Sequence, residues 1–282
     1  MGIYLNPGNE VFRQIVNADL YIDKTMLLRE TNRLLDSANK YICMSRPRRF
    51  GKTVTGNMLC SYYSRGCDSR ELFEPFRISR DPGFLKNLNR YHVIKIDMNS
   101  EYQSAQEKKD VLKILTEEVR EEMKTAFPDV VFRGSDSLAR CILRVYAAKQ
   151  ETFIILLDEY DVFVREQVSD ELFQEYLAFL NSLFKSDTLR PAISLAYLTG
   201  ILPIVRDKVQ SKLNNFREYT ILNAGVFAEY VGFTARETEE VCAERCIDFN
   251  ECRRWYNGYR QKGFEIYNPE SVARCVETHI FD

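Results

Sequence analysis

The apolar residues of the chain fall into short runs, separated by longer segments with the 3.6-residue period of amphipathic helices. The segment 105–126 is one helix candidate, and Ser169 is a predicted N-cap for another, whose apolar face runs from Leu172 to Leu183. The short runs predict strands at 41–45, 92–98, 153–158, 193–198 and 218–222. Strands that alternate with helices predict a three-layer α/β/α fold, with a mostly parallel sheet covered on both faces.

The pattern changes near the end of the chain. After Phe227 the strand signals fade, while Thr234 and Glu237 have the spacing of a capping box that opens a helix. We therefore expect a main domain over residues 1–225 and a small, mainly helical appendage over residues 226–282, for which a winged helix is one option. Such an appendage could close over a bound ligand as a lid.

The composition is that of an ordinary globular protein, with 45% apolar and 28% charged residues. The 39 basic and 41 acidic side chains nearly balance, which excludes a polycationic nucleic-acid binder and leaves room only for a local contact with DNA. The N-terminus shows no secretory signal, and the longest semi-apolar stretch, 193–205, is too short and too interrupted to span a bilayer. We therefore expect a cytoplasmic protein that makes no membrane contact.

The eight cysteines are spread through the chain, and with no export signal we expect them to be reduced thiols. Cys242, Cys246 and Cys252 cluster, but their spacing lacks the Cys-x2-Cys pattern of zinc sites. The sequence therefore favours core or helix-face cysteines over a metal site.

Residues 45–53, Ser-Arg-Pro-Arg-Arg-Phe-Gly-Lys-Thr, carry the clearest chemical signal. The Gly-Lys-Thr tripeptide follows a predicted strand and precedes a helical pattern, which is the context of a phosphate-binding P-loop. In such a loop Lys52 would reach the β- and γ-phosphates as a catalytic residue, Thr53 would supply a hydroxyl to Mg²⁺, and Gly51 would allow close approach of the phosphate. The predicted nucleotide-binding segment comprises Arg48, Arg49, Phe50, Gly51, Lys52, Thr53 and Val54.

The loop departs from the standard pattern at Arg46, where a glycine is usual, and Pro47 biases that residue toward an extended backbone. Arg46, Arg48 and Arg49 form a dense basic cluster in the sequence. The cluster could neutralise phosphate charge or bind another anion, while a solvated basic loop is the alternative.

A second signal follows the apolar run 153–157, which leads directly into Asp158 and Glu159. At the carboxyl end of a strand, Asp158 can hold Mg²⁺ through water, and Glu159 can orient and polarise an attacking water as the catalytic residue. The alternative is that both residues merely begin a polar loop. We interpret the nearby Asp161 as a turn residue.

Thr199 stands at the end of the next strand candidate, where it could contact the γ-phosphate or the attacking water as a further catalytic residue. A buried threonine bonded to the backbone is the alternative. Asn214 and Asn215 could form a polar sensor loop, although a structural turn fits their sequence at least as well.

With these motifs the chain resembles the bacterial predicted AAA-ATPase-like family, within the ASCE division of P-loop NTPases. The resemblance covers nearly the whole chain and rests on the segments 21–25, 45–53, 157–160, 199–200 and 267–272. Members of that family share the absence of the leading glycine, so Arg46 resembles a family feature.

The resemblance implies a set of ligands and roles. They are ATP as the nucleotide, Lys52 and Thr53 as phosphate and magnesium ligands, Asp158 as the second magnesium contact, Glu159 as the hydrolytic residue, and Tyr21–Thr25 near the adenine. Family members often carry a PD-(D/E)xK nuclease-like domain after the segment matching 267–272. Because this chain stops at Asp282, we expect no nuclease role for it.

The sequence therefore predicts a cytoplasmic, magnesium-dependent ATPase with a regulatory or mechanical role, whose P-loop domain spans residues 1–225. The alternative function is a nucleotide-dependent switch with slow turnover that acts on a protein or DNA partner. A small-molecule kinase is disfavoured, because Glu159 directly after Asp158 suits activation of water. The expected partners are ATP and ADP, and further candidates are a protein, a second copy of the chain, or DNA at the basic loop.

Overall fold

The computed structural model describes residues 2–203, 213–256, 259–261 and 264–281. Its main sheet has five strands in the order β2-β3-β4-β1-β5, and every neighbouring pair is parallel. The strands are β1 (Tyr41–Ser45), β2 (His92–Asp97), β3 (Phe153–Asp158), β4 (Ile193–Gly200) and β5 (Arg217–Tyr219). The predicted strands are confirmed, although β5 covers 217–219 rather than 218–222.

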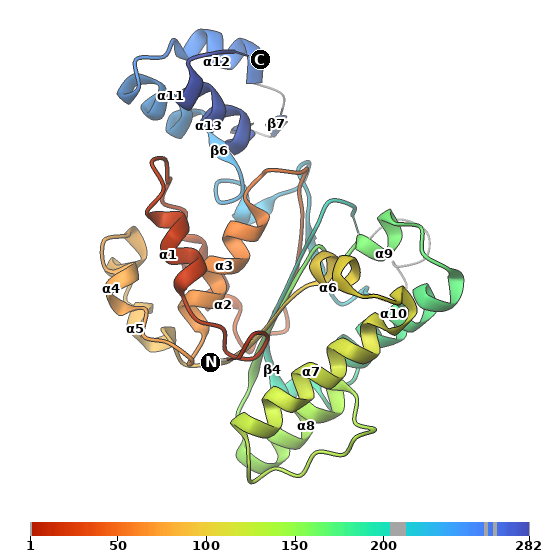
Figure 1. The fold of residues 1–282 in the computed structure, drawn as a ribbon. Helices are drawn as coiled ribbons and strands as arrows, with labels where there is room; N and C mark the ends of the chain where they lie inside the picture. Colours follow the sequence, from red (N-terminus) through yellow and green to blue (C-terminus); the bar gives the residue numbers. More distant parts are fainter. Residues whose placement is uncertain (1, 204–212, 257–258, 262–263, 282) are drawn as a thin grey trace.

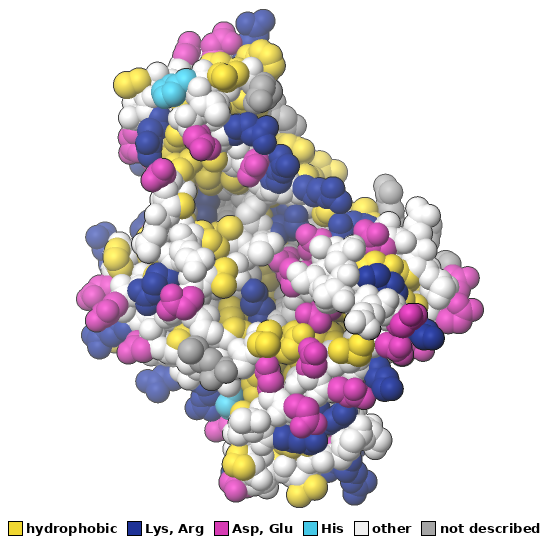
Figure 2. All heavy atoms as spheres, in the orientation of Figure 1, with side chains coloured by type: hydrophobic (Ala, Val, Ile, Leu, Met, Phe, Trp, Pro, Cys, Tyr) yellow, Lys and Arg dark blue, Asp and Glu magenta, His cyan; other side chains and the backbone are white. Residues whose placement is uncertain are grey.

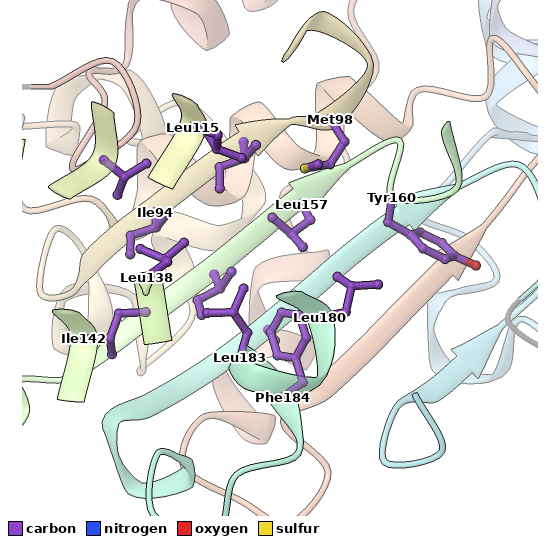
Figure 3. Packing of buried hydrophobic residues seen from close by; sticks show 14 of the residues in the cluster. Ile94, Met98, Leu115, Leu138, Ile142, Leu157, Tyr160, Leu180, Leu183 and Phe184 are labelled. Atoms are coloured by element: carbon purple, nitrogen blue, oxygen red, sulfur yellow. The ribbon is translucent and has the colours of Figure 1, made fainter. Parts of the chain in front are cut away.

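Helices cover both faces of this sheet. Side chains alternate along a strand, so in β3 Ile155 and Leu157 pack in one apolar cluster while Ile154 and Leu156 pack in the other. The first cluster, shown in Figure 3, is completed by α6 (Met98–Ser104), α7 (Val111–Ala126), α8 (Leu138–Lys149), α9 (Val162–Arg165) and α10 (Asp170–Phe184). The second is completed by α1 (Glu10–Val16), α2 (Leu27–Leu34), α3 (Lys52–Tyr63), α4 (Arg70–Phe73) and α5 (Phe84–Asn87) (Figure 1). The predicted three-layer α/β/α fold with a mostly parallel sheet is therefore confirmed.

Short 3-10 helices also lie in the connections between these elements. They are η1 (Arg77–Arg80), η2 (Lys108–Asp110), η3 (Arg190–Ala192) and η4 (Gly225–Phe227).

The helix predicted over 105–126 begins later than expected, at Val111. Before it, Lys108 Nζ donates hydrogen bonds to the carbonyl oxygens of residues 102, 103 and 105, around the end of α6. The pattern did not predict α6, which the Asp97 side chain caps by accepting from the N–H groups of residues 99 and 100. The Ser169 cap of α10 is confirmed. No helix within the described residues combines the length and the apolar character needed to cross a membrane.

Residues 233–278 form a separate layer beyond one end of the main sheet, which we call the C-terminal unit (Figure 1). It contains α11 (Ala235–Glu244), α12 (Phe249–Tyr256), α13 (Pro269–Thr278), β6 (Phe233–Thr234), β7 (Tyr259–Gln261) and β8 (Phe264–Tyr267). The capping box of Thr234 and Glu237 is confirmed at the start of α11. The small antiparallel sheet, in the order β6-β8-β7, was not predicted, because strands of two to four residues are too short to show a period.

Candidate active site

A cleft of about 710 Å³ lies between the carboxyl edge of the main sheet and the C-terminal unit. Its walls come from the segment 20–24, the loop and first helical turn 48–55, the residues after β3, and the C-terminal unit. Figure 2 shows basic side chains gathered between the C-terminal unit and the rest of the molecule. Clefts of about 300–1,000 Å³ commonly hold small ligands, and in parallel sheets such ligands bind beyond the carboxyl ends of the strands.

The loop between β1 and α3 has a left-handed backbone at Arg49 and Gly51, with φ of 68° and 80°. A Cβ at Gly51 would meet no other part of the chain within 4 Å, so the positive φ, rather than lack of space within the protein, is what favours glycine there. Phe50 is 1% exposed and packs edge-on against Tyr259, with ring centroids 5.0 Å apart. The loop is therefore anchored to the C-terminal unit through Phe50.

The start of α3 offers unpaired backbone donors. Helix α3 begins at Lys52 and has no side-chain cap. The N–H groups of a helix's first turn have no partner within the helix, and the helix dipole makes this end positive. Outside helices, no backbone hydrogen bond in the described part of the chain uses the N–H groups of residues 48–53. This donor set fits an anion such as a phosphate.

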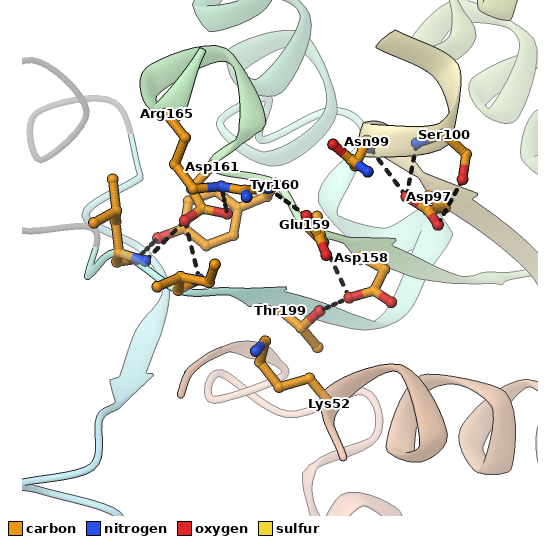
Figure 4. A network of polar contacts seen from close by, with 12 residues as sticks. Lys52, Asp97, Asn99, Ser100, Asp158, Glu159, Tyr160, Asp161, Arg165 and Thr199 are labelled. Carbon is orange, nitrogen blue, oxygen red and sulfur yellow. Dashed lines mark hydrogen bonds and ion pairs between the residues drawn. The ribbon is translucent and has the colours of Figure 1, made fainter. Parts of the chain in front are cut away.

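Lys52 lies over the loop and is 7% exposed. Its Nζ donates hydrogen bonds to the carbonyl oxygens of Arg46 and Pro47, at 3.0 and 2.9 Å. Burial lowers the pKa of Lys52, and the carboxylates of Asp158 and Glu159 act in the opposite direction. The ammonium group and the two carboxylates, which are far apart in the sequence, therefore lie within electrostatic reach of one another (Figure 4).

The remaining predicted nucleotide-binding residues, Arg48, Thr53 and Val54, also line the cleft. Arg48 and Thr53 are exposed, and Val54 is half-buried. Arg49 lies at the mouth of the cleft, where its Nη1 is 3.8 Å from Glu270 Oε1 on α13. The predicted segment 48–54 therefore forms one continuous wall.

Arg46 does not join a basic cluster at the cleft, which corrects the sequence interpretation. It is 1% exposed, and its Nη1 donates hydrogen bonds of 3.0 Å to the carbonyl oxygens of Ser45 and Tyr219. Burial lowers the pKa of Arg46 to about 10. Its guanidinium bonds to the carboxyl ends of β1 and β5. Of the three arginines, only Arg48 and Arg49 therefore line the cleft.

Asp158 ends β3 and is 6% exposed. Its Oδ1 accepts hydrogen bonds from the Thr199 hydroxyl and from the Glu159 N–H (Figure 4). One alternative from the sequence was a buried Thr199 whose hydroxyl bonds to the backbone. The hydroxyl bonds instead to the carboxylate of Asp158. Within the described part of the chain, no hydrogen bond reaches the second carboxylate oxygen of Asp158, Oδ2.

We expect Thr199→Val to destabilise the protein by about 1.5–3 kcal/mol, because it removes a hydrogen bond to a buried carboxylate while nearly preserving side-chain shape. Urea unfolding measures the free-energy difference. Thr199→Ser is the matched control, since it keeps the hydroxyl and loses only a methyl group. Equal stability of Thr199→Val and the wild type would contradict this role for the hydroxyl.

Glu159 lines the cleft, and its carboxylate accepts a hydrogen bond from Nη2 of Arg165 on α9. Arg165 and Asn99 also line the cleft, although neither was predicted from the sequence. Both had a usable signal: Asn99 stands two residues after the end of β2, at the same sheet edge, and Arg165 stands four residues after Asp161.

Asp161 and Tyr160 hold the connection after β4 in place. Asp161 is 1% exposed, and its Oδ2 accepts from the N–H groups of Ile201 and Leu202 at 2.9 and 2.8 Å. The Tyr160 hydroxyl donates to the Leu202 carbonyl oxygen at 2.7 Å. A Cβ at Gly200 would lie 2.6 Å from Cε1 of Tyr160, so only glycine fits beside this ring. Asp161 is thus a structural residue, in keeping with its interpretation as part of a turn.

Lys24 links the segment 20–24 to α11 of the C-terminal unit and to the segment that precedes that unit. Its Nζ donates to the Glu229 carbonyl oxygen and to Glu237 Oε1, both at 2.6 Å. Tyr21 and Ile22 line the cleft beside it. The predicted adenine side of the site therefore faces the same cleft as the loop 48–54.

Two further sequence predictions concern residues away from the cleft. The Nδ2 of Asn215 donates to the Phe184 carbonyl oxygen at 2.6 Å, which favours a structural turn over a sensor loop. Cys242 and Cys252 are buried and Cys246 is exposed, and the described residues contain no His, Cys, Asp or Glu cluster suited to a metal ion.

Comparison with known proteins identifies a family. The sequence profile described as "Predicted AAA-ATPase" matches residues 7–210. The "Uncharacterized protein in vnfD 5'region" of Azotobacter chroococcum mcd 1 is 24% identical over 285 residues, which cover 97% of this chain. The chain spans about half, 52%, of the length of that relative.

Two solved structures show distant similarity. The Orc1 protein of Aeropyrum pernix, in complex with DNA, matches with a TM-score of 0.45 and 14% identity, over 97% of this chain and 59% of that one. PCH-2 of C. elegans matches with a TM-score of 0.34 and 12% identity, over 86% of this chain and 48% of that one. The profile match, by contrast, spans most of the chain and includes both the loop 45–53 and the segment 157–160. The chain therefore belongs to the Predicted AAA-ATPase family.

Proposed function

We propose that the chain binds ATP with Mg²⁺ in this cleft and hydrolyses it to ADP and phosphate. The observation that carries the proposal is the approach of Lys52, at the start of α3, to Asp158 and Glu159, at the end of β3. Strand β4 lies between β1 and β3 and places Thr199 beside Asp158. The family supports the nucleotide, and the geometry supports the roles of the individual residues.

The phosphates would lie over the start of α3. The N–H groups of the uncapped first turn and of the loop before it would donate to phosphate oxygens, as helix N-termini do in anion sites. The ammonium group of Lys52 would exchange its bonds to the loop carbonyls for bonds to the β- and γ-phosphates. Arg48 and Arg49 add positive charge at the mouth of the cleft.

Thr53 and Asp158 would hold Mg²⁺. Hard oxygen ligands suit this ion. Oδ1 of Asp158 accepts hydrogen bonds from Thr199 and Glu159, and within the described residues no hydrogen bond reaches Oδ2. Bound there, the ion would neutralise charge that develops on the β- and γ-phosphate oxygens. Thr199 would act through Asp158, by keeping that carboxylate in position.

Glu159 would act on water. As the water oxygen forms a bond to the γ-phosphorus, Glu159 accepts one of the water protons. The bond between the γ-phosphorus and the oxygen that bridges to the β-phosphate breaks, and ADP leaves with that electron pair. The position of Glu159 on the wall of the cleft, one residue beyond Asp158, supports this role.

We further propose that residues 1–225 form the ATPase domain and residues 226–282 a lid. Two contacts support a lid that meets the site directly: Lys24 with Glu237, and Arg49 with Glu270. The segment 20–24 would lie against the adenine between these elements.

The test is a product analysis with purified protein, ATP and Mg²⁺. We expect ADP and inorganic phosphate in equal amounts, and no turnover when EDTA removes the metal. A phosphorylated small molecule formed in place of free phosphate would contradict the proposal. So would the absence of both ATP binding and turnover.

A second candidate is a switch with slow turnover that acts on a protein or DNA partner. One observation favours it: the carboxylate of Glu159 is already engaged by Arg165. A turnover that rises when DNA or a protein partner is added would favour this candidate over a constitutive ATPase.

A further inference from the structure

Glu159 must accept a proton in the proposed reaction, yet its carboxylate is held by a cation. Its Oε2 accepts from Nη2 of Arg165, and the side chains of Arg165 and Glu159 are only 14% and 31% exposed. Hydrogen bonds between charged partners are stronger than neutral ones, and partial burial limits their screening by solvent. Glu159 therefore has to leave Arg165 before it can face a water molecule at the phosphate.

A second carboxylate keeps Arg165 in place. The Nε of Arg165 lies 3.5 Å from Oδ1 of Asp161, whose side chain is 2% exposed. The other oxygen of Asp161, Oδ2, accepts hydrogen bonds from the N–H groups of Ile201 and Leu202. The guanidinium thus lies between the carboxylate of Glu159 and a carboxylate that is bonded to the connection after β4.

The backbone of Glu159 is fixed as well. Its φ is 51°, in the left-handed region that few non-glycine residues adopt. Its carbonyl oxygen accepts from the Val162 N–H at 3.0 Å, and the N–H of Tyr160 donates to the Thr199 carbonyl oxygen at 3.0 Å. Glu159 can therefore change partner only by rotating its side chain, and the Arg165 pair opposes that rotation.

We infer that Arg165 is a positioning residue that restrains Glu159, and that opening of the Arg165–Glu159 pair limits the rate of hydrolysis. The inference rests on the proposed function, since it concerns the same carboxylate. Such a restraint would slow turnover without weakening nucleotide binding. A partner that drew Arg165 away, or moved the connection 201–202 to which Asp161 is bonded, would raise the rate.

Arg165 also lines the cleft, so a direct contact with the γ-phosphate is the competing role. The restraining role is favoured because both partners of the guanidinium are carboxylates of its own segment, 159–165. Lys52 and the uncapped start of α3 already supply donors for the phosphates. The two roles predict opposite changes in rate when Arg165 is replaced.

The test is the kcat of Arg165→Gln at saturating ATP and Mg²⁺. We expect kcat to rise by roughly tenfold, a factor that the loss of one charge-assisted hydrogen bond can supply. The Kd for a non-hydrolysable ATP analogue should change by less than about twofold, because the phosphate donors are untouched. Asp161 keeps two backbone hydrogen bonds, so the variant should stay folded, which a thermal melt would check.

Two controls separate the restraint from a structural effect. The double variant Glu159→Gln with Arg165→Gln should be no faster than Glu159→Gln, because Arg165 acts through that carboxylate. Arg144→Gln removes a similar partly buried pair, with Asp136, outside the cleft, and should leave kcat unchanged.

An unchanged kcat in Arg165→Gln would overturn the inference. A lower kcat with weaker analogue binding would also overturn it, and would assign Arg165 to the phosphate. The proposed function is judged separately, by whether the wild type hydrolyses ATP and Glu159→Gln does not. If neither the wild type nor Arg165→Gln turned over, both proposals would fail.

Discussion

Glu159→Gln is expected to lower the rate of ATP hydrolysis by about 10²–10⁴, the usual contribution of a general base. Glutamine keeps the shape of the side chain and a hydrogen-bond acceptor, but it cannot take a proton from water. Binding should be nearly unchanged, because Lys52 and the start of α3 supply the phosphate donors. Steady-state phosphate release gives the rate, and titration with a non-hydrolysable ATP analogue gives the affinity.

Glu175→Gln makes the same chemical change at an exposed position of α10 that does not line the cleft. It should leave the rate unchanged. If Glu159→Gln hydrolysed ATP as fast as the wild type, another residue would have to activate the water. In that case Glu159 would have only a structural role beside Asp158.

Lys52→Ala is expected to weaken binding of the ATP analogue by about 10- to 100-fold. The substitution removes charge-assisted hydrogen bonds to the phosphates, each worth about 1.5–3 kcal/mol. It also leaves the Arg46 and Pro47 carbonyl oxygens without the ammonium donor. Calorimetric titration of both proteins with the analogue and Mg²⁺ measures the difference.

Lys149→Ala is a suitable control, since Lys149 forms an exposed pair with Asp129 and does not line the cleft. Its affinity for the analogue should match that of the wild type. If Lys52→Ala bound the analogue as tightly as the wild type, Lys52 would have no role in binding the phosphates. Reduced affinity together with a large loss of folding stability would instead indicate a structural role for its bonds to the loop.

The sequence predicted the parts of the fold that depend on local pattern. Continuous apolar runs mark strands buried on both faces, and all six residues of β3 are buried, so the central sheet could be predicted strand by strand. Elements that depend on tertiary contacts were missed. Helix α6 has seven residues, and β6 has two, too few to show a hydrophobic period.

The candidate site divides in the same way. Lys52, Asp158 and Glu159 could be predicted because the phosphate loop and the end of a buried strand have recognisable sequences. The burial of Arg46 could not be predicted. Its guanidinium bonds to carbonyl oxygens at the ends of β1 and β5, and β5 lies far along the chain from Arg46. The pair of Glu159 with Arg165 could not be predicted either. Glu159 has a left-handed backbone there, and its local sequence gives no signal for that conformation.

Whether ATP and Mg²⁺ bind between Lys52 and Asp158 is tested most directly by a crystal structure with Mg²⁺ and a non-hydrolysable ATP analogue. We expect the triphosphate over the start of α3, with Lys52 Nζ bonded to it and the metal between Thr53 and Asp158. An analogue bound elsewhere, with Lys52 still on the carbonyl oxygens of Arg46 and Pro47, would contradict it.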